Sequence, residues 1–136
     1  MILSVDSSVV IAILKGEARA ADWLRLLTTR RHEARLVVCD IAYAELAALF
    51  ESEAPLRDKL EKLAIRYDAI RDQTAFVAGQ MFAKYRRAGG PRTSLIPDFL
   101  IGAHALGQAD GLLTPDRGYL RRYFEGLQIH QPAGPM

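Results

Sequence analysis

The sequence predicts an α/β fold, a three-layer sandwich with a mostly parallel central sheet of about five strands. Short apolar segments alternate with longer segments of helical period along the whole chain. Such alternation is typical of strands joined by right-handed helical crossovers, which place helices on both faces of the sheet. Half of the 136 residues are apolar, which suffices for one core, and the chain is too short for two domains of usual size. We therefore expect a single domain over residues 1–136.

The first half of the chain alternates strand and helix twice. Residues 2–5 form a short apolar strand, and Ser7 or Ser8 can cap the helix that follows and ends at Gly16. An amphipathic helix is expected over residues 18–31, and a second strand over 35–39. Asp40 is a natural N-cap for a helix over residues 41–50.

The second half continues the alternation. Pro55 starts a helix that ends near Arg66, and a brief strand is expected at residues 67–70. A long helix over residues 73–87 ends at a Gly-Gly-Pro break, and Pro97 is tolerated in the first turn of the helix that Gly107 ends. Later elements are strands at 111–114 and 127–130 and a short helix at 116–124, and residues 131–136 are expected to form a flexible tail.

Composition restricts the classes of function. A net charge of +2 and a pI near 8.8 are too weakly basic to indicate nucleic-acid binding by themselves. The single cysteine, Cys39, lies in an apolar run and is expected to be a buried, unreactive thiol. The N-terminal residues lack a basic leader, and the apolar run at residues 9–14 is too short to span a bilayer. We expect a cytoplasmic protein that does not enter the membrane.

Four acids are placed to meet at one edge of the predicted sheet. Asp6 directly follows the first strand, Glu45 lies one turn into the helix after the second, and Asp98 lies in the first turn of its helix. Between Asp98 and Asp116 the chain forms a helix of about 11 residues and a strand of about five, and each spans roughly 16 Å. The helix therefore runs away from the carboxyl edge of the sheet and the strand runs back over the same distance. Both acids are thus expected at the carboxyl edge, where ligands of open α/β sheets bind.

Clustered carboxylates favour a bound cation. Two like charges about 4 Å apart repel by about 4 kcal/mol at an effective dielectric constant near 20. Oxygen ligands suit Mg²⁺ or Mn²⁺, and the sequence lacks the Cys and His spacing of a zinc site. Each acid alone has a plainer interpretation, as a helix cap, a strand end or an arginine partner. The set of four favours a metal site, with either one or two ions.

The same residues give the chain a resemblance to PIN-domain ribonucleases, and within them to VapC-type toxins of toxin-antitoxin modules. The resemblance extends in order and spacing over nearly the whole chain. It rests on four segments: Val5-Asp6-Ser7-Ser8, Tyr43-Ala44-Glu45-Leu46, Pro97-Asp98-Phe99-Leu100-Ile101-Gly102-Ala103 and Leu113-Thr114-Pro115-Asp116-Arg117. Two features depart from the pattern. Pro115 separates Thr114 from Asp116, and His104 stands where a small or apolar residue is expected.

This resemblance implies a parallel sheet, Mg²⁺-dependent endonuclease activity on RNA, a cognate antitoxin protein and a homodimer. Asp6, Asp98 and Asp116 would be the metal ligands, and Glu45 would bind the metal directly or through water. Ser7 and Thr114 are candidate hydroxyl donors that orient the carboxylates, although each could equally be a local turn or cap contact.

Arginines near the acids are candidates for contacts with RNA phosphates. Arg86, Arg87 and Arg92 flank the Gly-Gly-Pro break, and Arg117 follows the last acid directly. The alternative for these side chains is a solvated helix end. His104 lies about 240° around its helix from Asp98, at about 100° per residue, so we expect it in packing or at the surface.

Other functions remain open at this point. A phosphate-accepting receiver domain would need a lysine near the end of a late strand, but the last lysine is Lys84. A dehalogenase-like phosphatase would need an acid at position 8, which is Ser8. A housekeeping RNA-processing PIN nuclease, or a PIN-fold interaction module with little activity, would have the same sequence features as a toxin.

Overall fold

The computed structural model of the chain describes residues 1–90, 96–115 and 122–134. Its strands are β1 (Ile2–Val5), β2 (Arg35–Val38), β3 (Ile65–Tyr67), β4 (Gly111–Leu113) and β5 (Ile129–His130). Its helices are α1 (Ser7–Lys15), α2 (Ala20–Arg30), α3 (Asp40–Ala47), α4 (Glu53–Lys62), α5 (Asp72–Arg87) and α6 (Ile96–Gln108). The helix expected at residues 116–124 falls largely outside the described residues.

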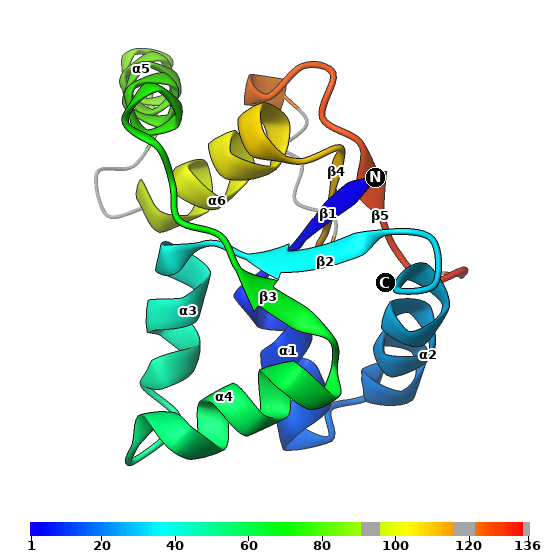
Figure 1. Ribbon diagram of the computed structural model, residues 1–136. Coiled ribbons are helices and arrows are strands. Elements are labelled where there is room, and N and C mark those ends of the chain that lie inside the picture. The colour runs from blue at the N-terminus through cyan, green and yellow to red at the C-terminus, as the bar shows by residue number, and fades with distance from the viewer. Residues whose placement is uncertain (91–95, 116–121, 135–136) are drawn as a thin grey trace.

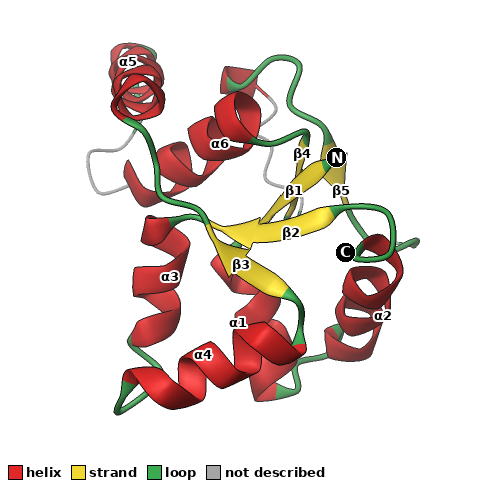
Figure 2. Ribbon diagram, in the orientation of Figure 1, coloured by secondary structure: helices red, strands yellow, loops and turns green. Residues whose placement is uncertain are grey.

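The strands form one sheet in the order β3-β2-β1-β4-β5, and every pair is parallel. Helices α5 and α6 lie on one side of this sheet and α1 to α4 on the other (Figure 1), so the three layers are helix, strand and helix (Figure 2). The predicted α/β sandwich with a parallel five-stranded sheet is confirmed. Because β1 lies at the centre, the residue that follows it has a neighbouring strand on either side.

The strand register assigns side chains to the two faces. Leu3 pairs with Leu36, which pairs with Ile65, so these three apolar side chains share one face. Ser4 is on the opposite face, where its hydroxyl contacts His104 of α6. The three central strands β1, β2 and β4 are largely buried on both faces, which explains why they appear in sequence as short apolar runs.

The caps of two helices differ from the sequence prediction. Asp6, and neither Ser7 nor Ser8, is the N-cap of α1, and its carboxylate accepts a hydrogen bond from the Ser8 backbone N–H. Asp40 is not the N-cap of α3, because the preceding Cys39 has the extended cap conformation. The Asp40 carboxylate instead accepts the Ile70 backbone N–H at 3.2 Å. The Asp40 side chain thus makes a contact with a distant segment of the chain in place of the expected cap contact with its own helix.

The strand expected at residues 67–70 was wrongly placed. The observed strand β3 begins at Ile65, which pairs with Leu36, and ends at Tyr67. The next residues are held by side chains from other elements. Gln108 donates to the Ala69 carbonyl at 3.0 Å. Burial of Ile65 against the core, which periodicity in the sequence does not reveal, decides the register.

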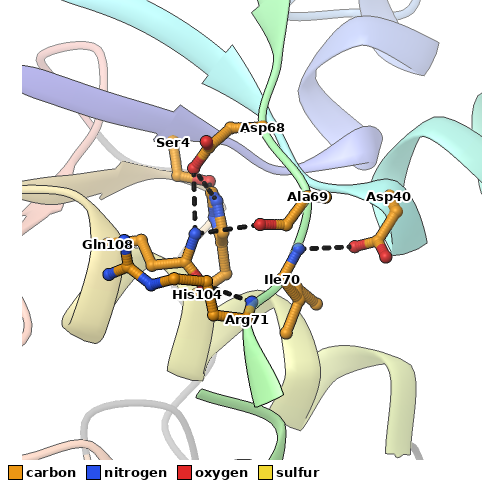
Figure 3. A network of polar contacts seen from close by, with 8 residues as sticks. All are labelled: Ser4, Asp40, Asp68, Ala69, Ile70, Arg71, His104 and Gln108. Atoms are coloured by element: carbon orange, nitrogen blue, oxygen red, sulfur yellow. Dashed lines mark hydrogen bonds and ion pairs between the residues drawn. The ribbon is translucent and has the colours of Figure 1, made fainter. Parts of the chain in front are cut away.

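His104 is fully buried and joins three elements (Figure 3). Its Nδ1 lies 3.0 Å from the Ser4 hydroxyl of β1, and its Nε2 lies 2.8 Å from a carboxylate oxygen of Asp68, after β3. Gln108 of α6 donates to the same Asp68 oxygen at 3.1 Å. The expectation that His104 takes part in packing is confirmed, and its polar atoms are satisfied.

Three further expectations concern the cysteine, the membrane and the tail. Cys39 is completely buried, and burial raises the pKa of its thiol to about 11. Among the helices that the structure describes, none is long and apolar enough to cross a membrane. The flexible tail stays a prediction, although Gln131 donates to the Thr114 carbonyl and Arg19 donates to that of Ala133.

Candidate active site

Asp6 and Thr114 lie side by side at the carboxyl edge of the sheet. In the parallel pair β1 and β4, Val5 is opposite Leu113, so the next residue of each strand emerges at the same level. The Asp6 backbone N–H continues the ladder by donating to the Leu113 carbonyl at 2.9 Å. The Thr114 hydroxyl then donates to Oδ2 of Asp6 at 2.6 Å, and both residues are buried.

The carboxylate of Asp6 is buried among neutral donors. Its other oxygen, Oδ1, is 3.4 Å from the Ser8 backbone N–H and 3.5 Å from the Ser7 hydroxyl. Only 4% of Asp6 is exposed, and within the described part of the chain it has no ion pair with a basic side chain. A buried charge that is held only by neutral groups favours binding of a cation.

Glu45 is connected to Asp6 through Ser7. Helix α3 follows β2, the other neighbour of β1, so its first turns also begin at the carboxyl edge. The Ser7 hydroxyl donates to Oε1 of Glu45 at 2.7 Å, and Ser7 is buried whereas Glu45 is exposed. The Ser7 side chain therefore lies between the two carboxylates, and its single hydroxyl proton is donated to Glu45. The structure has the hydroxyl contacts that were expected of Ser7 and Thr114, and their role in catalysis stays a prediction.

Asp98 lies in the first turn of α6 and is half-buried. At the far end of this helix, the Asp110 backbone N–H donates to the Ile2 carbonyl at the start of β1. Midway, His104 contacts Ser4. Asp98 is six residues before His104, or about 9 Å along the helix axis, and Asp6 is about 7 Å beyond Ser4 along the strand. Both acids are therefore displaced toward the carboxyl edge.

Packing fixes the start of α6 beside this edge. Phe99, the residue after Asp98, is fully buried, and its ring centroid lies 5.7 Å from those of both Phe82 in α5 and Phe124. Tyr123 packs against the same ring at 5.8 Å. Aromatic packing of this kind restricts the rotation of the helix, and with it the direction in which Asp98 leaves the backbone.

The remaining predicted acid and two arginines cannot be placed. Asp116, Arg117 and Arg92 lie outside the described residues. Among residues 1–90, 96–115 and 122–134, no three Asp, Glu, His or Cys side chains are close enough together to hold a metal ion. Of the predicted acids, the structure links Asp6 to Glu45 through a serine and places Asp98 toward the same edge.

Comparison with known protein families identifies the family of the chain. The family profile described as PIN domain matches residues 3–125, which include all four predicted acids. The chain belongs to the PIN domain family. No curated protein sequence matches it.

Solved structures with the same fold cover nearly the whole PIN domain. VapBC-1 from nontypeable Haemophilus influenzae is 23% identical, with a TM-score of 0.70 over 96% of this chain and 98% of the matched one. VapBC2 from Rickettsia felis, bound to a DNA fragment from its promoter, is 19% identical, with a TM-score of 0.67 over 97% and 99%. FitAcB from Neisseria gonorrhoeae is 20% identical, with a TM-score of 0.61 over 95% and 96%. These likenesses support the fold of the PIN domain.

The donor atoms of this PIN domain fit a hard divalent cation. The carboxylate oxygens of Asp6 and Glu45 are the metal-ligand type that such a cation prefers. The groups that donate hydrogen bonds to these oxygens are hydroxyls and a backbone N–H. Ser8 belongs to the first of the four segments that resemble the family and was a candidate cap of the first helix. The Ser8 hydroxyl is buried beside Asp6 without a hydrogen-bond partner among the described residues. The sequence signal for this unpaired hydroxyl was its position two residues after the first acid.

Two of the candidate phosphate-binding arginines are described. Arg86 and Arg87 are exposed in the last turn of α5, and the Arg86 guanidinium lies 5.9 Å from the centroid of the Phe82 ring. Helix α5 packs along α6. A contact of Arg86 or Arg87 with a phosphate stays a prediction.

Proposed function

We propose that this PIN domain is a metal-dependent endoribonuclease that acts as the toxin of a toxin-antitoxin pair. The observation that supports it most strongly is the buried Asp6 carboxylate, which contacts only neutral donors among the residues that the structure describes and lies next to Ser7, whose hydroxyl donates to Glu45. This arrangement concentrates negative charge at the edge of a parallel sheet, and a divalent cation compensates it.

The residues have distinct roles in this proposal. Asp6, Asp98 and Asp116 bind Mg²⁺, or Mn²⁺ in its place, and Glu45 binds it directly or through water. A bound divalent cation would lower the pKa of a water molecule and stabilise the charge that develops on the phosphate. Thr114 fixes Oδ2 of Asp6, and Ser7 holds Glu45 toward Asp6. These hydroxyls fix the carboxylates before metal binds, which reduces the cost of ordering them.

The toxin role and the partners rest on resemblance. The sequence segments around the acids resemble VapC-type toxins, and solved VapBC structures share the fold. A cognate antitoxin and a homodimer belong to the same proposal, as does a cytoplasmic location. Expression of the protein should arrest growth, and co-expression of a small protein encoded beside it should restore growth. A housekeeping nuclease would cause no such arrest.

Cleavage of total cellular RNA tests the reaction. The protein is incubated with RNA in Mg²⁺ or in excess chelator, and the new ends are mapped. We expect cleavage in Mg²⁺ only, giving 5′-phosphate and 3′-hydroxyl ends, because attack by an activated water does not use the RNA 2′-hydroxyl. A 2′,3′-cyclic phosphate would contradict this mechanism.

Variants separate the acid site from a contaminating nuclease. Asp6→Asn and Asp98→Asn should each abolish metal-dependent cleavage, because each removes an anionic ligand with little change in shape. Asp58→Asn is the matched control, since Asp58 is exposed on α4 and paired with Lys62 at 3.1 Å. Full activity in either active-site variant would refute the assignment, and an inactive parent protein would favour an interaction module.

A further inference from the structure

A second concave surface follows the edge strand β3, apart from the acids. It has a volume of about 1040 Å³ and lies between the loop that joins α2 to β2, the end of α4 and the start of α3. Arginines and tyrosines dominate its polar lining: Arg31, Arg35, Arg57, Arg66, Tyr43 and Tyr67. We call this surface the β3 groove. Asp6, Glu45 and Asp98 are not among the described residues that line it.

The positive charge of the groove is largely uncompensated. Arg35 and Arg66 are exposed, and their side chains form no ion pair or hydrogen bond with any residue that the structure describes. Arg31 has no acidic partner among the residues that the structure describes, and it donates to the neutral Lys62 carbonyl at 3.3 Å. Arg57, in contrast, is paired with Glu53 at 2.8 Å. Three arginines are therefore available to an anionic ligand.

Two acids in the lining reduce this charge without cancelling it. Glu33 is paired with Arg30, which is not part of the lining, at 3.5 Å. Glu61 is the other acid of the groove. Three available arginines thus face one acid that has no basic partner among the described residues. The groove is complementary to a ligand with repeated negative charge.

Strand geometry places the two uncompensated strand arginines on one face. Arg66 pairs with Val37, and Arg35 is two residues before Val37 on the same strand, so both side chains leave the same face of the sheet. One strand spacing and two residues of rise separate their Cα atoms by about 8 Å. The two guanidinium groups can therefore contact successive phosphates of an extended chain.

Tyr67 supplies an aromatic surface at the end of β3. It is 54% exposed, and its ring packs edge-on against Tyr43 with centroids 5.2 Å apart. Tyr43 is itself fixed, because its hydroxyl donates to Glu53 at 2.6 Å and the Arg57 guanidinium lies 5.8 Å from its ring centroid. Tyr67 follows Arg66 on the strand, so its ring leaves the opposite face of the sheet from Arg35 and Arg66, and the groove extends around the free edge of β3. An ordered, exposed tyrosine is typical of sites where single-stranded nucleic acid stacks its bases.

The strand edge itself is a poor site for a peptide. β3 has only three residues and carries the charged Arg66, and both features discourage pairing with another strand. We propose that the β3 groove is a second polynucleotide site, which binds single-stranded RNA across the free edge of β3, with Arg35 and Arg66 contacting phosphates on one face of the sheet and Tyr67 stacking a base on the other. It deepens the proposed function, because it rests on RNA as the substrate and adds a binding surface outside the acid site.

Binding without cleavage tests the groove. The full chain is titrated into a fluorescently labelled oligouridine of about 12 nucleotides, within the range that single-strand sites cover, in chelator at several salt concentrations. For single strands, each phosphate contact contributes about 0.7 to the slope of log affinity against log salt. Arg35→Gln/Arg66→Gln should therefore reduce that slope by about 1.4 and weaken binding. The control Lys15→Gln/Arg25→Gln removes the same charge from exposed positions outside the groove and should leave the slope unchanged.

A tyrosine variant distinguishes stacking from charge. Tyr67→Ala should weaken binding about fivefold or more, from a stacking contribution of at least about 1 kcal/mol per base, with the salt slope unchanged. Thermal unfolding of each variant checks that the fold is retained. Parent-like binding in both groove variants, or equal losses in the groove and control variants, would overturn the proposal. An acidic peptide that binds while oligouridine does not would also overturn it.

Failure of the groove and failure of the nuclease proposal are separable. The binding assay contains chelator and does not depend on cleavage, whereas the nuclease assay uses the protein with its groove intact. Lost binding in the groove variants of a protein that never cleaves RNA would support the groove and reject the nuclease. If the protein cleaves RNA and its groove variants bind oligouridine as the parent does, the nuclease proposal is supported and the groove proposal is rejected.

Discussion

Replacing Thr114 with valine tests whether the neutral donors around Asp6 stabilise its buried charge. Valine keeps the shape of threonine and removes the hydroxyl that donates to Oδ2 of Asp6 at 2.6 Å. Both residues are almost completely buried, so water cannot readily replace the lost donor. A hydrogen bond to a charged group contributes about 1.5–3 kcal/mol, and we expect Thr114→Val to lower the free energy of unfolding by that amount at neutral pH.

The corresponding shift in melting temperature follows from the length of the chain. An unfolding entropy of about 2.1 cal/mol/K per residue gives about 0.29 kcal/mol/K for 136 residues. Thr114→Val should therefore melt about 5–10 °C below the parent protein. Urea titration followed by circular dichroism measures the free energy directly, and calorimetry measures the temperature.

A double-mutant cycle attributes the loss to the bond. In an Asp6→Asn background the acceptor is neutral, so the same valine substitution should cost only about 0.5–1.5 kcal/mol. Thr74→Val is the matched control. Thr74 is also buried, but its side chain forms no hydrogen bond that the structure describes. If Thr114→Val changes stability no more than Thr74→Val does, the reasoning about the buried Asp6 charge is wrong.

Three further predictions concern residues elsewhere in the fold. Gly111→Ala should destabilise the protein by about 1–3 kcal/mol in urea titration, because a Cβ at this position would lie 2.8 Å from His130 Nε2. The control Gly79→Ala adds a Cβ in open space on an exposed helix face and should stabilise the protein by about 0.5–1 kcal/mol. His104→Leu leaves the buried Ser4 hydroxyl without its partner and Asp68 with only its contact to Gln108, and it should cost about 1–3 kcal/mol in the same assay. A loss no larger than that of the exposed control His32→Leu would contradict the role of the network. Burial raises the pKa of Cys39 to about 11 from 9.0, so thiolate formation favours the unfolded chain above pH 9. At pH 10.5, relative to pH 8, the parent should therefore lose about 2 kcal/mol more stability than Cys39→Ala, and equal losses would refute the burial argument.

The placement of the acids was predictable because, in a parallel sheet, the number of residues in each helix and strand decides at which edge a residue lies. Asp6 follows a strand, and Asp98 begins a helix that returns to the next strand, so both belong at the carboxyl edge in any right-handed α/β sheet. The hydroxyls of Ser7 and Thr114 were predictable as neighbours of the acids for the same reason. The partner of each hydroxyl was not predictable, because the contact from Ser7 to Glu45 depends on how α1 packs against α3.

Errors in the prediction occurred where a distant group competed with a local one. Asp40 is a residue type that favours the N-cap position, yet its carboxylate accepts a hydrogen bond from the Ile70 backbone N–H, 30 residues away. The strand expected after Tyr67 begins earlier, at Ile65, because β2 and the core beneath it select the register. His104 gave no sequence signal of a network, since its partners Ser4 and Asp68 come from separate parts of the chain.

The sequence by itself determined the α/β class, the parallel sheet and the positions of the acids relative to the predicted strands and helices. These depend on hydrophobic period and on chain length between elements, which are local properties. Tertiary structure decided which carboxylates lie next to Ser7, how the buried His104 joins α6 to β1, and which arginines line the β3 groove with Tyr67. These depend on side chains that are far apart in sequence and meet only when the layers pack, which no local pattern encodes.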